Sequence, residues 1–317
     1  MQETHHDLYG VALATARPTN ASLVTAALLT AVVCISFAAS LFKLADPTHP
    51  LIKAMIRLAI AAVCLSPLVV RGWRRGSLTR RVLNHAIMAG IAYGVHFGAW
   101  VWSLNLTSVA ASVTLVTTTP ILLALLSLFS RRDRPDRQLW LALATGVIGV
   151  TFIGGYDGLL APGALVGDGL ALLGAVAIAA YFLLSRRLGE EMDLWAYSGI
   201  ATAIGAITLG ITATFMGIPL LVSGTEAFSY LVLAALIPQL IGHSLLTWAL
   251  RHATPTQVAM VVVGEPAGAT IIAWIWLGDV VSIWLALGCA ITLTAVVIAS
   301  IRPGRSKATN PPETSEA

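Results

Sequence analysis

The chain has 317 residues, of which 57% are hydrophobic and only 11% are charged, whereas a soluble protein is about 25% charged. This composition excludes a soluble globular protein, which needs more charge on its surface, and a disordered chain, which needs fewer apolar side chains. The net charge of +4 does not indicate a nucleic-acid partner, because the basic residues lie between apolar segments, as in cytoplasmic loops of membrane proteins. We therefore predict an integral membrane protein.

Ten stretches are long and apolar enough to form helices across a lipid bilayer, which takes about 20 residues each. Their apolar runs are continuous, whereas the strands of a β-barrel would alternate apolar and polar residues. A cytoplasmic tail is predicted before them (1–21) and a disordered cytoplasmic tail after them (302–317). In chain order, the predicted spans are 22–43, 50–70, 82–103, 107–130, 138–155, 165–185, 194–216, 228–250, 256–278 and 281–301.

Charge orients these spans. Ten spans put both termini on one side, and all but three of the 19 Lys and Arg residues then fall on that side. Because cytoplasmic loops carry the excess of Lys and Arg, this side is predicted to be the cytoplasm of a bacterial inner membrane. The three exceptions, Lys43, Lys53 and Arg57, lie in the first two spans. The basic residues on the cytoplasmic side are Arg17, Arg71, Arg74, Arg75, Arg80, Arg81, Arg131, Arg132, Arg134, Arg137, Arg186, Arg187, Arg251, Arg302, Arg305 and Lys307.

A repeat is visible in the positions of tryptophan and proline. Trp102 and Pro120, in the third and fourth spans, recur as Trp248 and Pro266 in the eighth and ninth, and the offset is identical for the two pairs. Since five is an odd number of spans, a second copy would lie upside down in the membrane. We predict an all-α protein of two inverted five-helix repeats, 22–155 and 156–301. Inverted repeats are typical of secondary transporters, whose site lies near the midplane between the repeats.

Three stretches carry a family resemblance: SLFKLADPTHPLIKAMIRLAIAA (40–62), GDGLALLGAVAIAAYFLLSRRL (167–188) and GEPAGATIIAWIWLGD (264–279). They resemble the drug/metabolite transporter superfamily, of the EamA type with ten helices. Two positions depart from the family pattern: the Arg-rich turn 131–135 replaces a closing Gly-Glu, and Asp279 replaces a Glu. The resemblance implies movement of small organic metabolites without ATP, and we expect no cofactor.

Glu265 is the acidic residue predicted to lie deepest, roughly 13–14 Å into the ninth span. An ionised carboxylate there costs at least about 2.5–3.5 kcal/mol, so it must be protonated, paired or hydrated. Gly264 and Pro266 flank it, and Pro266 is expected to kink the helix because it lacks an N–H group. Two interpretations remain open: a carboxylate that binds a proton or the substrate, or a neutral side chain that fixes the kink through a hydrogen bond.

Thr119, directly before Pro120, is the equivalent of Glu265 in the first repeat. Its hydroxyl group is expected to cap a carbonyl that the proline leaves without a hydrogen bond. The alternative is that it lines a cavity. Arg57 lies about 10 Å into the second span. Its guanidinium is always charged, so it either extends outward to the membrane surface, like Lys43 and Lys53, or provides a counter-charge to a substrate carboxylate or an acid.

His96 and His243 are candidates for proton relay, because histidine titrates near neutral pH; hydrogen bonding between helices is the alternative. Gln239 lies one turn from His243 and is a further candidate for binding the substrate or a proton. Tyr93 and Trp100 lie on turns near the glycines of the third span and are expected to face a cavity. A metal site is not expected, because the sequence has no HxxxH pattern and no cluster of Cys and His.

Gly90, Gly94 and Gly98 form a ridge on the third span that allows close approach of another helix. We favour packing inside the bundle over contact in a homodimer. Three cysteines in apolar runs are interpreted as buried packing thiols: Cys34, Cys64 and Cys289.

The leading hypothesis is a secondary transporter that exports a small polar organic metabolite, such as an amino acid or a related compound, by alternating access. Protons are the candidate coupling ion. The alternatives are an uptake permease for a metabolite or vitamin, an intramembrane enzyme, and a channel subunit. An enzyme is disfavoured because no nucleophile–base pair or metal constellation is visible. A channel is disfavoured because no ring of charge or carbonyl filter is apparent.

Overall fold

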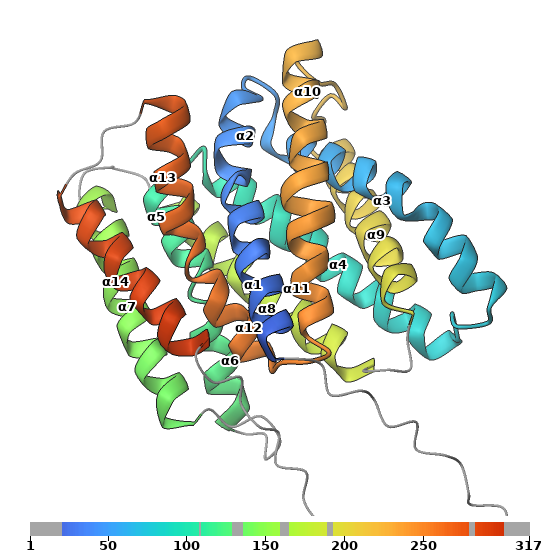
Figure 1. The fold of residues 1–317 in the computed structure, drawn as a ribbon. Helices are drawn as coiled ribbons and strands as arrows, with labels where there is room; N and C mark the ends of the chain where they lie inside the picture. Colours follow the sequence, from blue (N-terminus) through green and yellow to red (C-terminus); the bar gives the residue numbers. More distant parts are fainter. Residues whose placement is uncertain are drawn as a thin grey trace, which may run out of the picture.

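The computed structural model describes residues 21–107, 109–128, 136–158, 165–188, 193–278 and 283–300. These residues fold into a bundle of helices, and none of them forms a strand (Figure 1). The predicted terminal tails, the turn 131–135 and Asp279 lie outside the described residues, so the predictions made for them stay predictions.

The first half of the chain is helical at each of its five predicted spans. Two of these spans are interrupted, one at Phe37 and the other at Thr117 and Thr118, directly before Thr119-Pro120. The helices are α1 (Ala21–Ser36), α2 (Ala38–Leu44), α3 (Pro50–Arg74), α4 (Arg80–Ser103), α5 (Val109–Val116), α6 (Thr119–Leu128) and α7 (Arg137–Gly158).

The second half is likewise helical at its five predicted spans. The ninth is interrupted at Val263 and Gly264, and the eighth contains a π-helical segment around Pro238 that was not predicted. A proline cannot donate the normal helical hydrogen bond, and a wider turn accommodates its ring. The elements are α8 (Leu165–Leu188), α9 (Leu194–Phe215), α10 (Thr225–Ala234), η2 (Ala235–His243), α11 (Ser244–Ala249), α12 (Pro255–Val262), α13 (Glu265–Leu277) and α14 (Ile283–Ser300).

The helices of the two halves keep a nearly constant register. The offset along the chain from the start of α6 to the start of α13 is the same as the offset from Trp102 to Trp248. The starts of α3 and α9 are related by a slightly smaller offset. The interruptions before Pro120 and Pro266 therefore occur at equivalent positions, which supports two copies of one five-helix unit.

Equivalent helices from the two halves pack against each other. Helices α3 and α9 pair at one side of the bundle, and α7 and α14 pair at the other (Figure 1). The glycine ridge of α4 faces α9: a Cβ atom at Gly90 would lie 2.7 Å from the carbonyl oxygen of Ala201, and one at Gly94 would lie 2.8 Å from that of Gly205. The ridge thus packs inside the bundle, as we favoured, and α9 covers the surface that it offered for a dimer.

The turns of the chain collect at two ends of the bundle. At one end, Arg186 Nη1 donates a hydrogen bond to the carbonyl of Leu250, which joins the end of α8 to the end of α11. At the other end, the Ser223 amide donates to Thr48 Oγ1, which joins the turn after α9 to the turn after α2. The first end is called the arginine-rich end, after its described arginines: Arg71, Arg74, Arg75, Arg80, Arg81, Arg137, Arg186 and Arg251.

Much of the outer surface of the bundle is apolar. Val63, for example, is 71% exposed. Cys64 beside it is also exposed, so the prediction of a buried thiol there is wrong; an apolar side chain that faces lipid needs no burial in protein. Within the described ranges, six stretches are long and apolar enough to cross a membrane: Ala21–Leu44, Pro50–Arg74, Leu165–Arg186, Leu194–Phe215, Thr225–Ala249 and Pro255–Leu277.

Candidate functional site

Arg57 lies in a buried region that contains several polar side chains. It is the eighth residue of α3 and has no exposed surface. Its Nε donates a hydrogen bond to Gln239 Oε1 at 3.2 Å, and its guanidinium carbon lies 4.3 Å from the ring centre of Phe97 and 5.5 Å from that of Phe42. The side chain therefore points into the bundle and is stabilised by cation–π contacts, and the interpretation that Arg57 extends to the membrane surface is wrong.

Gln239 connects Arg57 to the other half of the molecule. Its Nε2 donates a hydrogen bond to Tyr93 Oη at 2.8 Å. The separation of Tyr93 and Gln239 along the chain equals the offset between the repeats, so they occupy equivalent positions in the two halves. The chain Arg57–Gln239–Tyr93, here called the central network, thus joins the two halves near the middle of their helices. Tyr93 also stacks on Tyr181, with 4.4 Å between ring centres.

The terminal nitrogens of Arg57 differ from its Nε. Nη1 and Nη2 are both buried, and neither has a hydrogen-bond partner among the residues that the structure describes. Arginine has five N–H donors, so four of them are left without an acceptor in this part of the chain. A buried donor without an acceptor is costly, and a buried charge without a partner more so.

Both histidines contact the rings of Phe97 and Tyr93. His96 Nδ1 is 2.9 Å from the carbonyl oxygen of Gly174; Nδ1 therefore carries the hydrogen and donates, which leaves Nε2 as an acceptor when the ring is neutral. The His243 ring meets the rings of Tyr93 and Phe97 edge-on, with centres 5.8 Å and 5.2 Å apart. Both histidines interact electrostatically with Arg57.

A cavity lies beside these histidines, where the interrupted helices of both halves approach each other. It offers about 40 Å³ to the centre of a water-sized sphere, whereas one water needs roughly 10–15 Å³. The cavity therefore has room for a few waters or one small polar group. Its lining residues are His96, Trp100, Val116, Thr117, Thr119, Pro120, Ile178, Phe182, His243, Leu246, Ala259, Val262 and Glu265.

Glu265 is the acidic member of the cavity wall. It begins α13, directly after the interruption at Gly264, and Pro266 follows it. Within the described part of the chain, its carboxylate forms no hydrogen bond or ion pair, although it interacts electrostatically with Arg57. No described residue of a neighbouring helix therefore provides the hydrogen bond that the structural interpretation of Glu265 requires. Glu265 lines the cavity instead.

The threonines before Pro120 satisfy backbone carbonyls, as we favoured. Thr117 Oγ1 donates to the carbonyl of Val113, and Thr119 Oγ1 donates to that of Val116 at 2.8 Å. Thr117 and Thr119 also line the cavity, so the two interpretations offered for these hydroxyls are compatible.

Trp100 stacks against His96, with 6.2 Å between ring centres, and lines the same cavity. Its indole Nε1 is buried and has no acceptor among the described residues. The predicted candidates from α4, η2 and α13 are thus gathered around one region. Sequence reasoning missed Phe97 and Tyr181, because an aromatic residue inside an apolar run carries no signal that separates a packing role from a site role.

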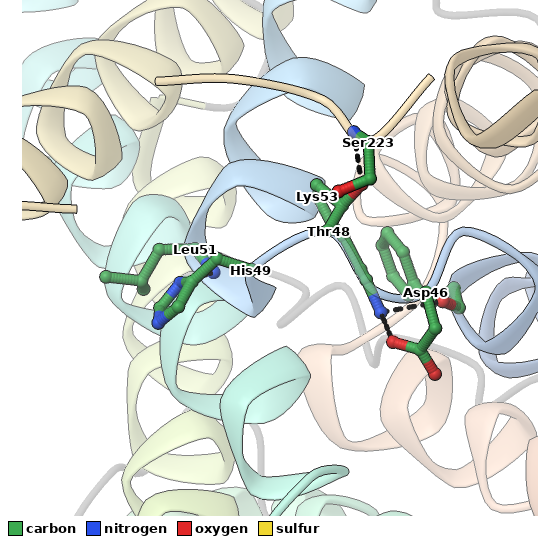
Figure 2. A network of polar contacts seen from close by, with 7 residues as sticks. Asp46, Thr48, His49, Leu51, Lys53 and Ser223 are labelled. Atoms are coloured by element: carbon green, nitrogen blue, oxygen red, sulfur yellow. Dashed lines mark hydrogen bonds and ion pairs between the residues drawn. The ribbon is translucent and has the colours of Figure 1, made fainter. Parts of the chain in front are cut away.

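A second polar network closes the end of the bundle opposite to the arginine-rich end (Figure 2). Lys53 Nζ donates to the carbonyl of Phe42 at 2.9 Å and forms an ion pair with Asp46. Lys53 is only 2% exposed. The expectation that its side chain extends outward to the membrane surface is therefore wrong, as it is for Arg57. His49 caps α3 by accepting a hydrogen bond from the Leu51 amide at Nδ1. Partial burial and the charge of Lys53 lower the pKa of His49 below its usual value of 6.5.

A helical membrane protein with two equivalent units around a central polar network has the architecture of a membrane transporter. The EamA-like transporter family matches residues 18–155 and 165–301, and the chain belongs to this family. The match covers both halves separately, which confirms the resemblance to EamA-type drug/metabolite transporters.

One curated relative is the "Uncharacterized transporter YdfC" of Bacillus subtilis (strain 168), 23% identical over 184 residues, which are 57% of this chain. The chain spans 59% of the length of that relative. A solved crystal structure is similar with a TM-score of 0.71 and 18% sequence identity, over 90% of this chain and 100% of the other. At that identity the likeness shows the fold alone.

Proposed function

We propose that this protein is a secondary transporter with ten spans, arranged as two inverted repeats (22–155 and 156–301), with both termini in the cytoplasm of a bacterial inner membrane. The alternation of the turns between two ends supports ten spans. The gathering of the described loop arginines at one end supports its placement in the cytoplasm, because cytoplasmic loops are rich in Lys and Arg.

The substrate is a small polar organic metabolite, such as an amino acid or a related compound, and the direction is export. The observation that carries this proposal is the central network of Arg57, Gln239 and Tyr93, near the cavity that His96, His243 and Glu265 line. Ionisable residues buried in membrane spans are costly and mark substrate or ion pathways. Because Arg57 and Tyr93 come from the first repeat and Gln239 comes from the second, a substrate there contacts both halves.

Alternating access uses the interruptions before Pro120 and Pro266. At these points the helices lack continuous backbone hydrogen bonds, so each can bend without breaking a complete helix. When the transporter opens at the arginine-rich end, the contact of Thr48 with Ser223 keeps the opposite end closed. When the transporter opens at the opposite end, this contact breaks. In each cycle Glu265 takes up a proton from one side of the membrane and releases it to the other, which couples transport to the proton gradient.

The test is reconstitution of the purified protein into proteoliposomes, followed by a screen of metabolites for flux. A carrier gives saturable flux and counterflow, in which excess unlabelled substrate on one side drives labelled substrate across. Flux that does not saturate and shows no counterflow would instead indicate a channel. If no metabolite in a broad screen moves faster than in empty liposomes, the proposal fails.

A further inference from the structure

Two buried cations one helical turn apart on α3 have opposite surroundings. Lys53 Nζ is satisfied by the carbonyl of Phe42 and the carboxylate of Asp46. Arg57 has one hydrogen bond, through Nε, and its Nη1 and Nη2 find no acceptor among the described side chains and carbonyls. Lys53 shows that a buried cation on this helix can be fully paired. The four N–H groups of Arg57 that have no acceptor among the described residues therefore need a separate explanation.

The contacts of Arg57 also fix which edge of the guanidinium stays free. Gln239 occupies Nε and is itself held by Tyr93 Oη. Phe97 and Phe42 lie against the group and offer no acceptor. The edge that carries Nη1 and Nη2 is left, and its parallel N–H groups match the two oxygens of a carboxylate.

None of the acidic side chains that the structure describes forms an ion pair with Arg57. Glu265 is close enough to interact electrostatically with Arg57, but no ion pair joins the two side chains. Its carboxylate lines the cavity instead, beside His96 and His243. Among the residues that the structure describes, the positive charge of Arg57 is therefore oriented, desolvated and unpaired, which is the state of a receptor for an anion.

We propose that Arg57 binds a carboxylate group of the transported substrate through Nη1 and Nη2, and that Gln239 is a positioning residue for the guanidinium. This inference rests on the proposed function, because it assigns the substrate class of the same site. The substrates are organic acids with a free carboxylate, amino acids among them. Esters and amides of the same compounds are excluded, since they lack the second anionic oxygen.

The experiment compares matched pairs of compounds in proteoliposomes that contain the full chain. The probes are L-amino acids, 2-hydroxy acids and 2-oxo acids, each beside its carboxamide, with inorganic phosphate as a second anion. We expect flux of at least one acid to exceed that of its carboxamide by roughly tenfold or more, as for loss of a partner of a buried charge. Equal flux of acid and carboxamide would overturn the inference, as would competition by phosphate but by no carboxylate.

Variants test whether Arg57 is the receptor. Arg57→Met should abolish the rise in melting temperature that the best acid gives to the wild-type protein. Without ligand, Arg57→Met should melt close to wild type, because removal of an unpaired buried charge offsets the loss of the cation–π contacts and of the hydrogen bond to Gln239. Arg57→Lys keeps the charge but not the fork, and should bind the acid roughly tenfold more weakly or worse. Lys53→Gln is the matched control, and should retain the preference for the acid.

The outcomes separate this inference from the proposed function. If acids and carboxamides are transported alike, or if the acid still stabilises Arg57→Met, the assignment of a carboxylate to Arg57 is wrong. The proposed function as a transporter is then unaffected. A marked loss of melting temperature in ligand-free Arg57→Met would show a structural role for the arginine and would also overturn the assignment. If no compound of any kind is transported, both proposals fail.

Discussion

The interrupted helices α5–α6 and α12–α13 have the same backbone layout and different chemistry. In the first, Thr117, Thr118 and Thr119 donate to backbone carbonyls one turn back. In the second, the equivalent positions hold Val263, Gly264 and Glu265, which offer no hydroxyl group. The interruption is therefore a shared property of the two repeats, because a proline follows it in each of them. A titratable side chain at the interruption, Glu265, is present only in the second repeat.

The largest difference between the two interruptions is expected in transport. Glu265→Gln should reduce the acceleration of flux by a pH gradient by roughly 5- to 150-fold, the range of coupling between two sites, because an amide cannot exchange a proton. Thr119→Val should change flux by no more than roughly fivefold, since a neutral hydrogen bond contributes about 1 kcal/mol. Both variants are measured in proteoliposomes with and without a pH gradient. A Glu265→Gln protein that keeps its full response to the gradient would exclude proton coupling at this residue.

A smaller effect is expected on stability, just after the second interruption. A Cβ atom at Gly268 would lie 2.2 Å from Ser36 Oγ and 2.9 Å from Ser36 Cβ, whereas the equivalent position in the first repeat, Leu122, holds a large side chain. Gly268→Ala should therefore destabilise the protein by about 1–3 kcal/mol, the usual cost of overpacking, as measured by thermal unfolding in detergent. Gly169→Ala is the control, because a Cβ atom there meets nothing within 4 Å. Equal melting temperatures for the two variants would mean that α1 and α13 do not pack as closely as described.

The hydroxyl groups of the first interruption give the next smaller effect. Thr118 Oγ1 donates to the carbonyl of Leu115 at 2.7 Å, while its equivalent Gly264 has no side chain. Thr118→Val should cost about 0.5–1.5 kcal/mol, the net contribution of one hydrogen bond, and should leave the pH response of transport unchanged. An increase in melting temperature for Thr118→Val would show that the hydroxyl is not needed to satisfy the break.

Hydropathy predicted the positions of the spans well, because each needs about 20 apolar residues whatever its neighbours are. The repeat was predicted from Trp102, Trp248 and the two prolines, since side chains that shape the backbone keep their register. The direction of Arg57 was not predictable. Whether a long side chain extends to the surface or into the bundle depends on the rotation of α3 about its own axis, which its partners α4, α9 and η2 set. The pairing of Gln239 with Tyr93 is likewise a product of packing, although the offset between the repeats relates the two in the sequence.

The residues that cap α3 and α9 also differ between the repeats, and this difference is expected to have a still smaller effect on stability. His49 and Asp193 occupy equivalent positions, one residue before each helix; His49 accepts from one amide, and Asp193 accepts from two. A neutral His49 is required, because a protonated Nδ1 cannot accept a hydrogen bond. Burial and Lys53 lower the pKa of His49 from 6.5, so its contribution to stability is present above pH 6.5 and is lost as the pH falls through the lowered value.

Acidification should therefore weaken the cap of α3. The effect should stay below about 1 kcal/mol, since a cap is worth roughly that much and His49 is partly exposed to solvent. The measurement is the melting temperature of wild type and His49→Asn at pH 7.5 and pH 5.5. Asparagine caps a helix without titrating, so His49→Asn should lose less stability than wild type between these values. An identical loss in the two proteins would assign the acid sensitivity to groups other than His49.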